Sequence, residues 1–190
     1  MVSYIHQHKA LPFLRPCEEG AVFEEVKAMI LFIEGLAMCF IMLITCVIGI
    51  SFDGPVGSVT FYDKEVQERA VELGLITKEK IKKNAVMSGI AVFIPIIILI
   101  PLMVYGINGA EGFKDGLFQM LFIGLMYGLF DRLFIDWFWV GKTKAWNIPG
   151  TEDLKPYIQK KALIFNWVGT VVVHPLFYVL LAWVMSLIRS

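Results

Sequence analysis

Long apolar stretches alternate with polar connections along this chain. The apolar stretches cover residues 26–52, 85–108, 114–140 and 162–188. A helix needs about 20 apolar residues to cross a hydrocarbon core of about 30 Å, and each stretch is long enough. The pattern therefore predicts an all-α fold, a polytopic integral membrane helix bundle with four transmembrane helices, which forms a single membrane domain over residues 1–190.

The connection between the first two stretches is polar and predicts a helical hairpin over residues 63–83. Its first helix begins near Asp63 and ends at Gly74, a residue type that readily adopts the left-handed conformation found after helix ends. Thr77 is a suitable cap for the second helix, which leads into the membrane. The predicted bundle thus has a polar helical hairpin between its first and second transmembrane helices.

The N-terminal segment, residues 1–25, differs from a cleavable signal peptide. Acidic residues precede the first apolar stretch, where a signal peptide has a basic flank, and the stretch is longer than the apolar region of a signal. These acidic residues are Glu18, Glu19, Glu24 and Glu25. We therefore expect the segment to stay attached.

Composition agrees with a membrane protein. Of the residues, 57% are hydrophobic and 14% are aromatic, and the mean hydropathy is +0.69. The 17 basic and 17 acidic residues balance, so the net charge gives no reason to expect a nucleic-acid partner. The predicted partner is the lipid bilayer.

Lysine and arginine are distributed unevenly between the two sides of the predicted bundle. The two long connections hold Lys64, Arg69, Lys78, Lys80, Lys82, Lys83, Lys142, Lys144, Lys155, Lys160 and Lys161. The opposite side holds Lys9, Arg15, Lys27, Lys114 and Arg189. Because cytoplasmic connections carry the excess of basic residues, we expect both connections in the cytoplasm and both termini outside the cell membrane.

Several polar side chains fall inside the apolar stretches. A charged group near the middle of a bilayer costs about 2.5 to 3.5 kcal/mol on insertion scales, so it normally faces a protein interior or water and often marks a functional path. The candidates for an interior polar path or a ligand-binding site are Glu34, Asp131, Arg132, Asp136, Asn166, Thr170, His174 and Tyr178. No pattern assigns a catalytic role to any of them.

The third stretch places small residues and a charge pair along one stripe of a helix. Its members, at four-residue steps, are Gly116, Met120, Gly124, Gly128, Arg132 and Asp136. Gly124 and Gly128 let another helix approach closely, which predicts a homo-oligomer that packs through them. Arg132 can pair with Asp136 one turn further on. The simpler interpretation is that the glycines only pack and the charges only neutralise each other.

The fourth stretch carries a second stripe at the same spacing, made of Asn166, Thr170, His174 and Tyr178. Together with the first stretch it predicts a ladder of polar groups from Glu34 through Tyr178 and His174 to the charged residues of the third stretch. The simpler interpretation is structural, because Pro175 removes a backbone donor that Thr170 or His174 can help to compensate.

The first stretch has Cys39, Met42 and Cys46 on one face, where they are candidate soft-metal ligands. Such residues are also ordinary packing residues in helices, so we predict no metal site. The sequence has no phosphate-binding loop, dinucleotide-binding glycine motif or zinc-protease motif, and no pattern identifies a cofactor.

The end of the third stretch and the connection after it read FDRLFIDWFW and then IPGTED. In the connection, Pro149 and Gly150 predict a turn, and Thr151 followed by acidic residues predicts a capped short helix. This combination, roughly Phe130 to Asp153, resembles small, uncharacterised four-span bacterial membrane proteins. The resemblance implies the same multi-helix membrane fold and brings no activity with it.

Three functions fit this arrangement. Transport through an intramembrane polar path would need a small homo-oligomer, because four helices enclose little space alone. A membrane-embedded enzyme could act on an anionic amphiphile at the cytoplasmic interface, with Asp131, Asp136 and His174 as acid-base groups. Geometry weakens this second function, because on an α-helix Asp131 and Asp136 point about 140° apart. The third is an accessory or scaffolding subunit. We favour transport.

Overall fold

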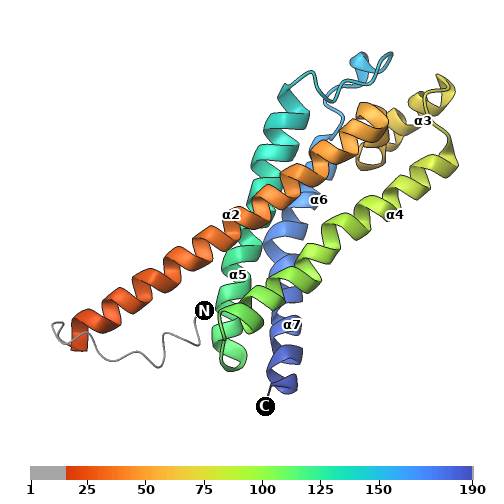
Figure 1. Cartoon of the computed structure of the whole chain (residues 1–190). Coiled ribbons are helices and arrows are strands. Elements are labelled where there is room, and N and C mark those ends of the chain that lie inside the picture. The colour runs from red at the N-terminus through yellow and green to blue at the C-terminus, as the bar shows by residue number, and fades with distance from the viewer. Residues whose placement is uncertain (1–15, 190) are drawn as a thin grey trace.

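The computed structural model describes residues 16–189, and its helices confirm the all-α class (Figure 1). Four helical spans are long and apolar enough to cross a membrane. They are Glu24–Gly57, Lys78–Ile107, Gly112–Val140 and Lys160–Ile188. Each covers one of the predicted stretches to within one residue, so the fold is the predicted four-span bundle.

Helices and π-helical segments alternate along the later spans. In chain order the α-helices are α2 (Pro16–Gly57), α3 (Lys64–Glu72), α4 (Lys78–Ile94), α5 (Gly112–Phe130), α6 (Lys160–Val168) and α7 (His174–Ile188). The π-helical segments are Pro95–Leu99 and Leu102–Ile107 after α4, Asp131–Val140 after α5, and Gly169–Val173 between α6 and α7. A π-helix is wider than an α-helix because its hydrogen bonds join residues five apart, so these segments change which side chains share a face.

The first span is one end of a longer helix. Of the predicted N-terminal segment, residues 1–15 lie outside the described residues, and the chain is already in α2 from Pro16. At its other end, Gly54 has a φ of 62°, a left-handed conformation suited to glycine, and Pro55 follows it. The regular helix therefore ends at Asp53, beside the predicted end of the stretch at residue 52.

The polar hairpin follows the predicted pattern. Gly74, with a φ of 70°, ends the turn after α3. The side chain of Thr77 accepts a hydrogen bond of 3.2 Å from the backbone N–H of Lys80, which caps α4. The second helix of the hairpin then runs without interruption into the membrane span. Pro95 is the first residue of one π-helical segment in this span and Pro101 directly precedes the other, and the helix continues past both.

The third span forms the centre of the bundle, because α5 packs against both α2 and α7 (Figure 1). Small residues on α5 allow α7 and the segment before it to approach closely. The ring of Tyr178 lies directly on Gly124, and a Cβ atom placed on Gly128 would be 2.7 Å from the Thr170 methyl group. The two glycines are thus covered within the chain. A homo-oligomer stays a prediction, but its contact surface would have to lie elsewhere.

Both long connections meet at one end of the bundle and form what we call the connection module, residues 58–77 and 141–159 (Figure 1). The backbone N–H of Asp63 donates to the Tyr157 carbonyl at 3.2 Å, and the Asp63 carboxylate accepts from the Gln159 N–H at 2.9 Å. The rings of Tyr62 and Tyr157 pack with their centroids 4.9 Å apart. These contacts join the two halves of the chain. Which end of the bundle faces the cytoplasm stays a prediction.

Tyr157 is the polar centre of this module. Its hydroxyl accepts a hydrogen bond of 3.0 Å from the buried N–H of Ile148 and shares another of 3.0 Å with the hydroxyl of Thr151. Thr151 is fully buried, and its hydroxyl donates to the Ile148 carbonyl. The short helix predicted here is a single 3-10 turn, Glu152–Leu154, and the Thr151 side chain does not cap it, because that side chain is turned towards Tyr157.

The two tyrosines of the module provide a matched comparison. Tyr157→Phe should lower the free energy of unfolding by about 1–3 kcal/mol, because it leaves a buried N–H unsatisfied. Tyr62→Phe should leave stability unchanged or raise it, because the buried Tyr62 hydroxyl has no hydrogen-bond partner. Thermal unfolding in detergent measures both. Equal losses in the two variants would contradict this account of the module.

The contact between α5 and α7 can be tested at Gly124. Gly124→Ala should destabilise the protein by about 1–3 kcal/mol, because the added methyl group overlaps the Tyr178 ring. Gly89→Ala is the control, since a Cβ at that position of α4 meets nothing within 4 Å. The measurement is the melting temperature of each variant in detergent. A Gly124→Ala protein as stable as the control would argue against this contact.

Candidate functional site

The polar residues predicted inside the membrane fall into two separate groups in the structure. One group, which we call the arginine cluster, consists of Asp131, Arg132, Asp136, Asn166 and His174. The other contains Glu34 together with residues that sequence analysis did not select. Thr170 and Tyr178 lie between the two groups, where α7 and the π-helical segment before it pack on α5.

Arg132 is the centre of the arginine cluster. Its guanidinium group forms hydrogen-bonded ion pairs with both Asp131 and Asp136. The side chain of Arg132 is 15% exposed, that of Asp131 is 22% exposed and that of Asp136 is 13% exposed, so all three charged groups are largely buried. A pair between Arg132 and one aspartate was predicted, and the structure has both.

The backbone explains how both carboxylates reach the same arginine. Asp131–Val140 is π-helical, so its backbone hydrogen bonds connect residues five apart. Asp131 and Asp136 are five apart and therefore return to the same side of the helix. The separation of about 140° that was expected on an α-helix is wrong for this segment, because that expectation assumed 3.6 residues per turn.

Side chains from the fourth span complete the cluster. Asn166 hydrogen-bonds with the Asp136 carboxylate, and His174 lies within electrostatic reach of both Asp131 and Arg132. Thr170 is turned to its own helix, where its hydroxyl donates to the Asn166 carbonyl at 3.1 Å. The cluster is therefore built from two spans, with Thr170 supporting the helix that carries Asn166 and His174.

The cysteines of α2 do not form a joint ligand set. The Cys39 thiol donates to the Met126 carbonyl at 3.7 Å, while Cys46 lies near the carboxylates of Asp131 and Asp136. Among the described residues, no three side chains of histidine, cysteine, aspartate or glutamate are arranged to hold a metal ion. Cys46 is thus a side chain of the first span that lies near the arginine cluster.

The second group is a hydrogen-bonded chain at the opposite end of the spans. It runs from Lys27 to Asp115 at 2.7 Å, from Asp115 to Gln119 at 3.1 Å, from Gln119 to Asn108 at 3.0 Å, and from Asn108 to Glu34 at 2.8 Å. We call these five residues the amide network. Gln119 is only 1% exposed, so the network reaches into the interior of the bundle.

Four members of the amide network were not predicted from the sequence. The missed residues are Lys27, Asn108, Asp115 and Gln119, which lie at the ends of the apolar stretches. One signal was present, because Asp115 and Gln119 are four residues apart and therefore share a helix face. The partner of Glu34 gave no such signal, since Asn108 is distant in sequence.

The two groups are not joined by direct hydrogen bonds within the described part of the chain. Four buried polar atoms on or beside the spans have no hydrogen-bond partner: Asn108 Oδ1, Tyr178 Oη, His174 Nδ1 and Arg132 Nε. Unsatisfied buried polar atoms cost about 1–3 kcal/mol each and are rare in folded proteins. The polar residues of the predicted ladder are therefore not connected to one another by a continuous chain of direct hydrogen bonds within the described residues.

The connection module lies against the arginine cluster. Tyr62 of the module is close enough to Asp136 to interact with its charge, and the Trp139 and Trp146 rings meet edge to face at 5.1 Å. Burial raises the pKa of Tyr62, and the neighbouring Tyr157 and Asp136 raise it further. Tyr62 therefore presents a neutral hydroxyl to the cluster.

Four apolar spans around buried ionisable groups define a multi-pass membrane protein. No protein-family model, curated protein or solved structure matches this chain. The resemblance to small four-span bacterial membrane proteins stays a prediction.

The ion pairs predict a coupling that mutagenesis can measure. Arg132→Gln alone should lower the free energy of unfolding by about 3–5 kcal/mol, because two buried carboxylates lose their counter-charge. Adding Asp136→Asn should recover part of that loss, since the second change removes one of the stranded charges. A double-mutant cycle in detergent gives the coupling energy.

The control pair is Arg69 and Asp153 in the connection module. Its charged atoms are 3.8 Å apart and its side chains are 39% and 65% exposed, so its coupling should be only about 0–1 kcal/mol. Absence of coupling between Arg132 and both aspartates would refute the account of the cluster.

Proposed function

We propose that this membrane protein is a small transport protein that passes protons between the amide network and the arginine cluster. The observation that carries the proposal is the position of two clusters of ionisable side chains at opposite ends of the spans, with an unpartnered nitrogen of His174 in one cluster and the unpartnered hydroxyl of Tyr178 between the two. Chains of acidic residues and histidine inside a membrane are typical of proton relays.

The charges of the two groups support this proposal. The arginine cluster has two carboxylates and one guanidinium group, and the amide network has two carboxylates, Glu34 and Asp115, and one ammonium group, Lys27. Arg189 lies at the same end as the amide network, but it donates to the Tyr105 carbonyl. Each group therefore has one carboxylate in excess. A buried charge without a partner is costly, so each site favours the uptake of a proton or a small cation.

In this proposal, protons move between the amide network and the arginine cluster along the contact between α5 and α7. Tyr178 rests on Gly124, and His174 Nδ1 is 3.6 Å from the position of a Cβ on Gly128. Glycine has no side chain to occupy this space, so the two polar side chains of α7 face the backbone of α5. A proton would pass by way of His174 and Tyr178, with water completing the hydrogen bonds.

The oligomer remains part of this proposal. Four helices enclose little space, and many apolar side chains on the outer faces of the spans are exposed in the single chain. An accessory role beside another membrane protein would use the same faces. The charged interior groups favour transport over that role, because a scaffold has no need of buried carboxylates in excess.

A second function, catalysis on an anionic amphiphile, is favoured by the π-helical segment. The segment brings Asp131 and Asp136 to the same side beside Arg132, which removes the geometric objection to a carboxylate pair. His174 supplies a further acid-base group. In this alternative the arginine cluster is the active site, and the amide network only holds the helices together.

Proton flux into vesicles containing the purified protein separates these functions. Glu34→Gln and His174→Phe should each reduce flux after a pH jump to the level of protein-free vesicles, because both remove a titratable group from the path. Gln at position 34 keeps an oxygen that can accept the hydrogen bond from Asn108, so folding should persist. Glu24→Gln is the matched control, an exposed glutamate on the same helix, and should leave flux unchanged.

The alternative outcomes are distinct. If the protein is an enzyme, Asp131→Asn should abolish turnover of an anionic amphiphile, whereas Glu34→Gln should have little effect. Wild-type vesicles without proton flux would overturn the transport proposal. Normal flux in folded Glu34→Gln protein would remove the amide network from the path.

A further inference from the structure

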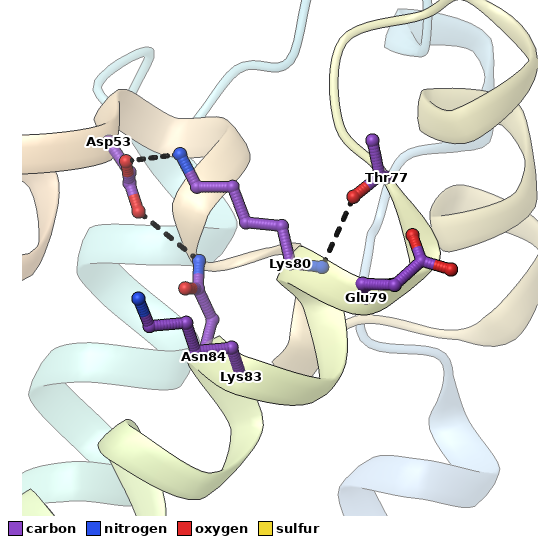
Figure 2. A pocket seen from close by; sticks show the side chains of 6 residues that line it. All are labelled: Asp53, Thr77, Glu79, Lys80, Lys83 and Asn84. Carbon is purple, nitrogen blue, oxygen red and sulfur yellow. Dashed lines mark hydrogen bonds and ion pairs between the residues drawn. The ribbon is translucent and has the colours of Figure 1, made fainter.

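A pocket outside both polar groups lies where the polar hairpin meets the membrane span (Figure 2). It has a volume of about 490 Å³ and lies between the kinked end of α2 and the first turns of α4. Its lining residues are Asp53, Thr77, Glu79, Lys80, Lys83 and Asn84. Neither the transport proposal nor its alternative uses this pocket.

Most of the polar groups in the pocket already have partners. The Asp53 carboxylate accepts from Lys80 at 2.6 Å and from Asn84 at 3.3 Å (Figure 2). Asn84 also donates to the Gly57 carbonyl at 3.0 Å. These bonds tie the end of α2 to α4. Lys83 has no hydrogen bond and no ion pair among the described residues, although its charge is within reach of Asp53. Its ammonium group is therefore available to a ligand.

The surroundings of the pocket are positively charged. Glu79 hydrogen-bonds with the Thr77 side chain and lies near the ammonium groups of Lys78 and Lys82. The lining holds two lysines, Lys80 and Lys83, against two acidic residues, Asp53 and Glu79, and the flanking Lys78 and Lys82 add two positive charges. The excess of two positive charges favours an anionic ligand, and each lysine near a membrane surface contributes about 1 kcal/mol to the attraction of anionic lipids.

An apolar surface continues from Lys83 into the membrane. Val86, Met87 and Ile90 follow it at three, four and seven residues along α4, so they lie on the same helix face. Their exposed fractions are 63%, 58% and 48%, which leaves them open to lipid. A free ammonium group above a strip of exposed apolar side chains matches the shape of a phospholipid, with its charged head and its acyl chains.

We infer that an anionic phospholipid binds at this place. Its phosphate pairs with Lys83 inside the pocket, and its acyl chains lie along Val86, Met87 and Ile90. Because Asp53 and Lys80 in the same pocket join α2 to α4, the lipid contacts the point where the first two spans are held together. The inference rests on the membrane fold and is independent of the transport proposal.

Lipid retention tests the inference directly. The protein is placed in nanodiscs of phosphatidylcholine with a minor fraction of phosphatidylglycerol, extracted into detergent, and its bound lipids are counted by native mass spectrometry. Wild-type protein should retain phosphatidylglycerol in preference to phosphatidylcholine. Lys83→Gln should reduce that preference about fivefold, as expected for the loss of one lysine contact. Lys144→Gln, an exposed lysine in the other connection, is the control and should retain the lipid normally.

Three results would overturn the inference. One is equal retention of the two lipids by wild-type protein, and another is unchanged retention by Lys83→Gln protein of normal melting temperature. The third is displacement of phosphatidylglycerol by inorganic phosphate or by glycerophosphoglycerol at matched concentration, which would show that the acyl chains contribute nothing and that the pocket takes a free phosphate group.

Discussion

An unpaired charge inside a membrane costs free energy, and the arrangement of the polar residues in this bundle depends on avoiding that cost. Arg132 lies among largely buried side chains and takes two carboxylates as partners, one immediately before it and one a turn after it. The segment from Asp131 is π-helical, which brings the two carboxylates towards the same side of the helix. The same segment carries Trp139, which packs against the connection module, so the charge pairing also sets how the module lies on the bundle.

The spans were predictable because run length and hydropathy depend on composition within one segment. The cap at Thr77 and the helix end at Gly74 were predictable for the same reason, since each is a local rule of backbone geometry. The pair between Arg132 and Asp136 followed from their spacing. Each of these predictions used neighbouring residues only.

The remaining features depend on contacts between distant segments or on a change of helix type. A pattern read at 3.6 residues per turn cannot indicate a π-helix, so Asp131 was expected to point away from Asp136. The partner of Glu34 is Asn108, which belongs to another span. Threonine is a residue type that often caps a helix, yet the hydroxyl of Thr151 hydrogen-bonds with Tyr157 because the two residues are buried together.

The attachment of α2 has a mechanical consequence. One end of this helix is fixed to α4 by Asp53, next to the connection module, while nearer its start the side-chain ties are Lys27 with Asp115 and Glu34 with Asn108. Each of these two ties includes a carboxylate that can gain a proton. The helix is thus clamped at both ends as well as packed on α5 between them, so protonation of a carboxylate in one clamp would loosen that end without freeing the helix.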